Sequence, residues 1–85
     1  MNKRKITIAY ELLKYFLVNK YSSIDSISKN VPLTKQEIQK GLELLRENEF
    51  VFLQAEGDYY LNHKVTYVVS QMIRAHEEFY GKNAI

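Results

Sequence analysis

The two histidines are the residues best suited to metal binding or proton transfer, and their spacing supports neither role. His63 and His76 are thirteen residues apart, which is not a spacing of zinc ligands. Glu77 follows His76 as in zinc-protease helices, but the second histidine of that motif is missing. Cysteine is absent, which excludes disulfides, thiolate ligands and a cysteine nucleophile. We expect neither a metal nor another cofactor.

Other side chains that serve in catalysis lack the partners that would activate them. The chain has seven tyrosines and several serines, but no motif places a base beside any of them. Glu77 and Glu78 are adjacent on a predicted helix, so they point in different directions, unlike paired catalytic carboxylates. Three glycines and one proline leave no room for a glycine-rich phosphate loop. The sequence therefore predicts that the protein is not an enzyme.

The elements that carry these residues fit one domain of 85 residues. Apolar residues at three- and four-residue spacing predict a helix over 6–20. Ser22 or Ser23 can cap a short second helix over 24–29, which Pro32 then ends. No apolar run approaches the roughly 20 residues of a membrane span. We expect a cytoplasmic protein that does not bind membranes.

The sequence from Thr34 to Glu37 is a capping box, in which each side chain satisfies a backbone N–H of the other residue. It predicts a third helix to about Asn48. Gly41 falls on the apolar face of that helix, where it costs about 1 kcal/mol relative to alanine in helix propensity. We therefore expect another helix to approach closely at Gly41.

The last part of the chain predicts a β-hairpin followed by a fourth helix. β-Branched and aromatic residues over 50–54 and 59–61 favour two strands, and Glu56-Gly57-Asp58 has the composition of a turn. Asn62 can cap a helix over about 63–80, and Gly81 is placed to end it. We expect a basic arm over residues 1–5, one domain over 6–80 and a frayed tail over 81–85.

This order, three helices, a hairpin and a fourth helix, resembles that of winged helix-turn-helix DNA-binding proteins. The resemblance spans about residues 6–80, and individual positions carry it. Ile27 and Ser28 are the apolar–small pair of the first helix, and Val31 is the apolar residue before the turn. Leu33 and Thr34 are the apolar–hydroxyl pair after the turn, and Ile38 is the β-branched anchor. Gly41, Leu42 and Leu45 are the small residue with two leucines that follows. Pro32 and Glu49 stand where the family favours glycine.

The resemblance implies a mainly helical α+β winged-helix fold whose third helix enters the DNA major groove. Its base-reading residues would be Thr34, Lys35, Gln36, Gln39, Lys40 and Glu43. Candidates for phosphate contacts are Lys3, Arg4, Lys5 and Lys29. Glutamine can pair with adenine, lysine can donate to guanine, and glutamate can accept from cytosine. A solvated helix face and a solubilising basic terminus are the simpler interpretations of the same residues.

The charge distribution supports DNA binding by the first half of the chain only. Residues 1–40 carry eight Lys or Arg and three Asp or Glu, a net +5. Residues 41–85 carry four and seven, a net −3. The predicted wing tip, with Glu56 and Asp58, would be repelled by phosphate. Either the wing stays off the DNA, or the domain binds a protein partner instead, through the acidic wing and the fourth helix.

The fourth helix has more apolar residues than a small core needs. In small winged-helix repressors the last helix often pairs with its copy in a second chain, and this implies a homodimer. The residues predicted for that contact are Val65, Val68, Val69, Met72, Ile73, His76, Phe79 and Tyr80. The simpler interpretation is that this helix only covers its own domain. The leading prediction is a small dimeric transcriptional regulator that acts by occupying its DNA site.

Overall fold

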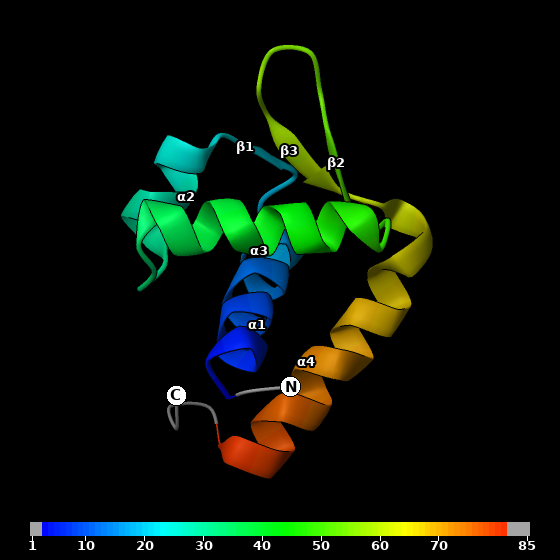
Figure 1. Ribbon diagram of the computed structural model, residues 1–85. Helices are drawn as coiled ribbons and strands as arrows, with labels where there is room; N and C mark the ends of the chain where they lie inside the picture. Colours follow the sequence, from blue (N-terminus) through cyan, green and yellow to red (C-terminus); the bar gives the residue numbers. More distant parts are fainter. Residues whose placement is uncertain (1–2, 82–85) are drawn as a thin grey trace.

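A computed structural model describes residues 3–81, and its polypeptide is mainly helical with one small antiparallel sheet (Figure 1). The elements follow the order α1 (Lys3–Val18), β1 (Tyr21–Ser22), α2 (Ile24–Asn30), α3 (Lys35–Glu47), β2 (Val51–Leu53), β3 (Tyr59–Leu61), η1 (His63–Val65) and α4 (Thr66–Tyr80). The mainly α, α+β class predicted from the sequence is confirmed. Met1, Asn2 and most of the predicted tail, residues 82–85, lie outside the described residues.

Helix α1 begins three residues earlier than predicted. Lys3, Arg4 and Lys5 therefore belong to the helix and not to the predicted basic arm. No helix-breaking residue separates them from Ile6, and Arg4 is held in place by an ion pair with Glu37 of α3. The arm was predicted from charge alone, which does not distinguish a solvated tail from the first turn of a helix.

Side-chain caps define the starts of α2 and α3, as the sequence predicted. The side chain of Ser23 accepts a hydrogen bond from the backbone N–H of Ser26. Thr34 and Glu37 form the complete capping box. Val31 ends α2 in extended backbone, which is the conformation that the following Pro32 favours. The connection between α2 and α3 is therefore short and fixed at both ends.

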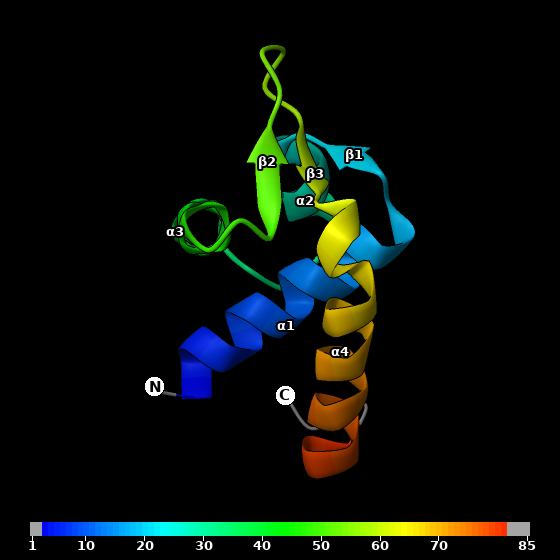
Figure 2. The same ribbon diagram turned by 90° about the vertical axis from the view of Figure 1, so that its right-hand side faces the viewer.

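The sheet has three strands, one more than predicted, in the order β1-β3-β2. Tyr21 pairs with Tyr60 and Ser22 with Tyr59, while β2 pairs with the other edge of β3. Figure 2 shows the three strands side by side, with α2 behind them. A two-residue strand has no alternation to detect, so the sequence did not predict β1.

Helix α4 is entered through a turn of 3-10 helix, whereas one helix from His63 was predicted. Asn62 caps this entry, because its side chain accepts a hydrogen bond from the backbone N–H of Lys64. Gly81 ends α4 with φ 81°, a backbone conformation that favours glycine. Gly57 takes φ 92° in the hairpin turn for the same reason.

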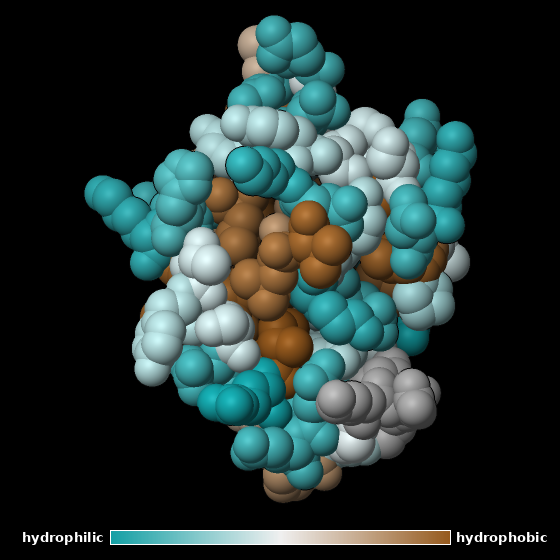
Figure 3. Space-filling model, turned by 180° about the vertical axis from the view of Figure 1, so that it is seen from behind, coloured by the Kyte–Doolittle hydropathy of each residue, from teal (hydrophilic) through white to brown (hydrophobic). Residues whose placement is uncertain are grey.

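The core lies around α1, which packs against both α3 and α4. The largest fully buried side chains come from five helices and strands: Leu12, Leu13, Ile27, Ile38, Leu42, Val51 and Val69. At Gly41 a Cβ atom would lie 2.6 Å from Cδ1 of Leu12 and 2.7 Å from Cγ2 of Ile8. The close approach predicted for this glycine is confirmed, and its partner is α1. From behind, hydrophobic side chains gather in the middle of the surface (Figure 3).

None of the helices within residues 3–81 combines the length and the apolar character that a membrane crossing requires.

Candidate nucleic-acid interface

Helix α3 has one buried face and one exposed face, which separates its core residues from its polar ones. Ile38, Gly41, Leu42 and Leu45 are buried. Gln36, Gln39, Lys40 and Glu43 are exposed. The separation follows from the 3.6-residue period of the apolar positions. The four exposed side chains belong to the predicted base-reading set, and they share one surface of the molecule.

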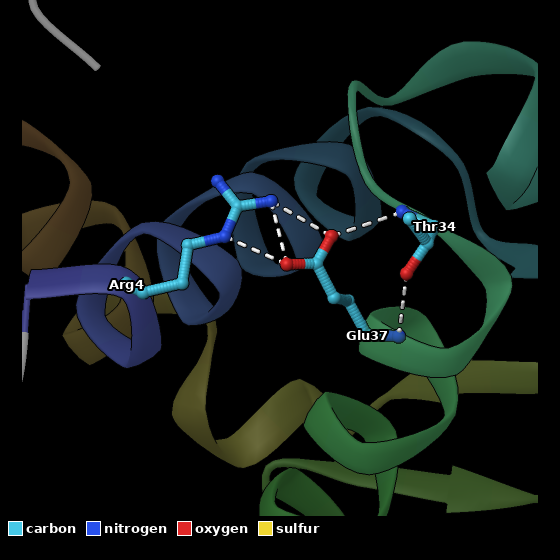
Figure 4. A network of polar contacts seen from close by, with 3 residues as sticks. All are labelled: Arg4, Thr34 and Glu37. Atoms are coloured by element: carbon cyan, nitrogen blue, oxygen red, sulfur yellow. Dashed lines mark hydrogen bonds and ion pairs between the residues drawn. The ribbon is translucent and has the colours of Figure 1, made fainter.

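The first turn of α3 is fixed by a network that adds Arg4 to the predicted capping box (Figure 4). The Thr34 hydroxyl accepts a hydrogen bond from the Glu37 backbone N–H at 3.1 Å. The Glu37 carboxylate accepts one from the Thr34 N–H at 3.0 Å. Arg4 donates through Nε and Nη2 to the two oxygens of that carboxylate, both at 2.7 Å. The network ties the start of α1 to the start of α3.

The network already engages Thr34 and Arg4, two residues that the sequence predicts to contact DNA. The backbone hydrogen bond from Thr34 and the hydrogen bond from Arg4 lower the pKa of Glu37 below its ordinary value of 4.5. Glu37 is therefore ionised at neutral pH and neutralises Arg4. The Thr34 hydroxyl already accepts the capping hydrogen bond. Thr34 belongs to the predicted base-reading set and Arg4 to the predicted phosphate contacts, so a DNA contact by either residue must compete with these partners.

A second ion pair links α2 with α3. Nζ of Lys35 lies 2.7 Å from Oδ1 of Asp25, and both side chains are largely exposed. Hydrogen bonding by Lys35 lowers the pKa of Asp25. The pair holds Lys35 toward α2, where Lys29 is also exposed. Exposed ion pairs of this kind are weak and exchange readily, so Asp25 does not hold Lys35 permanently.

The exposed face of α3 changes sign along its length. Its first half carries Lys35 and Lys40 with Glu37, a net +1, whereas its second half carries Glu43 and Glu47 with Arg46, a net −1. The N-terminal half is therefore the more positive one, and it is the half that faces base edges in recognition helices. Lys29 lies on the same side of this gradient, at the end of α2.

A groove of about 410 Å³ runs between α1 and α3 and joins the two predicted sets of contacts. Its lining includes Lys5 of α1 together with Gln36, Lys40 and Glu43 of α3. Ile8, Ala9 and Leu44 also line it. Of the predicted phosphate contacts, Lys5 thus lies beside the reading face, and the Lys3 side chain lies outside the described part of the structure.

The predicted dimer residues of α4 divide into two groups. Val69 and Ile73 are 0% and 9% exposed because they pack in the chain's own core. The ring of His76 stacks on Tyr10 of α1 at 3.9 Å between centroids, and Val65 and Tyr80 are half-buried. The simpler interpretation, that α4 covers its own domain, accounts for the burial of these five residues.

The remaining predicted dimer residues form an exposed stripe. Val68, Met72 and Phe79 are 49%, 43% and 81% exposed. Ala75, which the sequence analysis did not include, is also exposed. The intervals 68, 72, 75 and 79 alternate four and three residues, which is the spacing of a coiled-coil seam. We call these four residues the α4 stripe.

The hairpin turn extends away from the helices (Figure 1). Glu56 is exposed and Asp58 is half-buried at this turn, so the acidic tip predicted from the sequence is accessible. Within residues 3–81, His, Asp and Glu side chains form no group of three that could hold a metal ion. No protein-family model matches the chain, and neither a curated protein nor a solved structure matches it significantly.

Proposed function

We propose that this protein is a winged helix-turn-helix protein that binds specific sites on double-stranded DNA and regulates transcription as a homodimer. The observation that carries the proposal is the exposed face of α3. Gln36, Gln39, Lys40 and Glu43 project from a helix that its opposite face anchors in the core. A rigid helix with these donors and acceptors is suited to read base edges.

The order of the elements supports the winged-helix assignment. A short turn joins α2 to α3, and the β2–β3 hairpin follows α3 directly as the wing. Strand β1, between the first two helices, pairs with β3 and fixes the base of that wing. The α2–α3 pair would act as the helix-turn-helix, with α3 as the recognition helix.

The charge gradient of α3 sets the proposed docking. The N-terminal half enters the major groove, with Gln36 and Gln39 placed to pair with adenine and Lys40 with guanine or phosphate. Lys5 and Lys29 flank this half and contact the phosphates. The acidic tip of the wing stays off the DNA, since Glu56 and Asp58 would be repelled by the backbone.

The α4 stripe is the proposed contact between two copies of the chain. Pairing of two such stripes removes the exposed parts of Val68, Met72 and Phe79 from water, and each Å² of apolar surface that is buried contributes about 25 cal/mol. A two-fold axis through this contact presents two α3 helices symmetrically, which matches a palindromic DNA site.

The proposal is tested by selecting bound sequences from a random duplex pool and measuring affinity for the selected site. The double variant Gln39→Ala, Lys40→Ala should lose about 1–3 kcal/mol of specific binding free energy. The matched control Gln71→Ala, Arg74→Ala removes the same chemistry from α4 and should bind as the wild type does. Equal affinity of the two variants would show that α3 is not the reading helix.

A protein-interaction module is the second candidate function. The exposed α4 stripe and the acidic wing tip favour it, because both could contact another protein. This function predicts no detectable binding of any duplex at low salt. Enrichment of one sequence family in the selection would exclude it as the main activity.

A further inference from the structure

The outer face of the sheet carries a row of three aromatic side chains, one from each strand. Tyr21 of β1 and Phe52 of β2 both pair with Tyr60 of β3, on its two sides. Ring centroids are 5.9 Å apart for Tyr21 and Tyr60, and 5.6 Å apart for Phe52 and Tyr60. Directly paired residues point to the same face of a sheet, so the three rings share one face. Tyr21 and Phe52 are tilted by 59° and 61° relative to the Tyr60 ring.

The core does not account for this row. The alternate residues of the strands point inward: Ser22 and Val51 are buried, and Tyr59 packs against the core. The outward residues remain accessible, since Tyr21 is 58% and Phe52 36% exposed. Contiguous exposed aromatic surface of this kind marks a binding site more often than scattered single residues do.

A hollow of about 260 Å³ lies beside the row and adds positive charge to it. Tyr21 and Tyr60 line the hollow together with Phe16, Leu17 and Leu61. Lys20 and His63 also line it, and both side chains are exposed. The hollow therefore combines flat apolar walls with nitrogen donors, a combination suited to a planar ring that carries an anionic group.

We propose that this face binds the unpaired nucleotides of single-stranded DNA or RNA. Bases stack on Tyr21, Tyr60 and Phe52, one base enters the hollow, and Lys20 and His63 contact the phosphates next to it. Every base has a π-face, so such stacking tolerates different sequences, whereas groups that follow the backbone supply the electrostatic attraction. The site is separate from the groove-reading face of α3 and goes beyond the proposed duplex function.

Charge sets the position of the strand on this face. Glu56 and Asp58 lie at the wing tip, beyond the β2–β3 pair, and they repel phosphate there. Lys20 and His63 lie at the other end, where α1 leads into β1 and β3 leads into η1. The backbone of the bound strand therefore follows the end of the sheet that lies near α1 and leaves the wing tip free.

The test measures binding of the whole chain to fluorescent oligo-dU and oligo-U of about 12 nucleotides, within the usual site sizes of single-strand binders. Tyr21→Ala and Phe52→Ala should each weaken binding roughly 5- to 150-fold. Tyr21→Phe keeps the ring and should bind like the wild type. Oligo-dU differs from oligo-U only in the sugar, so preference for oligo-U over oligo-dU would identify RNA as the ligand, and the reverse would identify DNA.

Tyr67→Ala is the matched control, because Tyr67 is 74% exposed on α4 and belongs neither to the row nor to the lining of the hollow. It should leave oligonucleotide binding unchanged, and all variants are compared only where thermal melts show that they fold. The proposal is overturned if no oligonucleotide binds at low salt, or if Tyr67→Ala weakens binding as much as Tyr21→Ala. It is also overturned if Lys40→Ala, and not Tyr21→Ala, removes single-strand binding. If the wild type self-associates but binds no oligonucleotide, and Tyr21→Ala abolishes the self-association, the row is a protein contact instead.

The same measurement on duplex DNA separates the two proposals. Tyr21→Ala should not change duplex affinity if α3 is the duplex-reading element. Loss of duplex binding in the α3 variants with intact oligonucleotide binding would support both sites. If the wild type does not bind duplex DNA, the proposed function is refuted. The single-strand site is then judged by the oligonucleotide measurements alone.

Discussion

The turn after α3 contains a residue whose replacement by glycine should stabilise the protein. Glu49 has φ 61°, a left-handed conformation, and it is the one non-glycine residue with positive φ among residues 3–81. Its backbone N–H donates to the Arg46 carbonyl at 3.0 Å, and its carbonyl accepts from the Asn62 side chain at 2.9 Å. The position is therefore held by its neighbours in a conformation that disfavours L-residues.

The expected effect of Glu49→Gly is the difference of two terms. Left-handed backbone costs an L-residue about 1–2 kcal/mol, and glycine removes that cost. Glycine also makes the unfolded chain more flexible, which opposes folding by about 0.4–1 kcal/mol. The net stabilisation is about 0.5–1 kcal/mol, a rise in Tm of roughly 2–8 °C for a domain of this size.

Glu49→Ala is the control, since it removes the same side chain but keeps a Cβ atom. Thermal melts should place the glycine variant above the wild type and the alanine variant close to it. Equal melting of the glycine and alanine variants would refute the strain argument, because any gain would then come from removing the glutamate charge.

Three further perturbations test the packing, the capping network and the α4 stripe. Gly41→Val should destabilise the fold by about 1–3 kcal/mol in urea titrations, because its Cβ meets Leu12 and Ile8 at 2.6 and 2.7 Å; an unchanged midpoint would contradict the packing of α1 on α3. Glu37→Gln should lower Tm at neutral pH. Because the pKa of Glu37 is lowered in the fold, its stabilising contribution is present above the ordinary value of 4.5 and is lost as the pH falls through the lowered pKa. The difference in Tm should therefore shrink in acid, and a difference that is constant with pH would exclude this origin. Phe79→Glu should yield monomers in sedimentation and should lower Tm at concentrations where the wild type is dimeric, because dimerisation stabilises the folded chain. Phe79 is 81% exposed within one chain, so the chain's own core is not disturbed; an unchanged sedimentation coefficient would exclude the stripe as the dimer contact.

Local rules predicted the parts of the fold that local interactions determine. The capping box at Thr34, the Ser23 cap of α2 and the termination at Gly81 each depend on residues within a few positions, and the structure has all three. Strand β1 was missed because its two residues gain their hydrogen bonds from β3, nearly forty positions later. The start of α1 was missed because its stabilising ion pair joins Arg4 to Glu37.

In the candidate site too, local sequence patterns predicted some residues, whereas contacts between distant parts of the chain decided others. The exposed face of α3 followed from helical periodicity, which specifies both its buried and its exposed residues. Periodicity on α4 does not say which partner covers an apolar residue, so Val69 and Val68 looked equivalent. In the structure Val69 is fully buried in the chain's own core, whereas Val68 is 49% exposed. The aromatic row needs the register of three strands and could not be read from the sequence.

The most direct test of the account is the salt dependence of binding to random duplex DNA. Each phosphate contact should contribute about −0.9 to the slope of log K against log salt concentration. Lys5, Lys29 and Lys40 in each chain of a dimer would give six contacts and a slope of about −5. The account predicts binding at low salt that falls with this steepness. Absence of binding at low salt, or a slope near zero, would contradict the proposal that α3 docks on DNA.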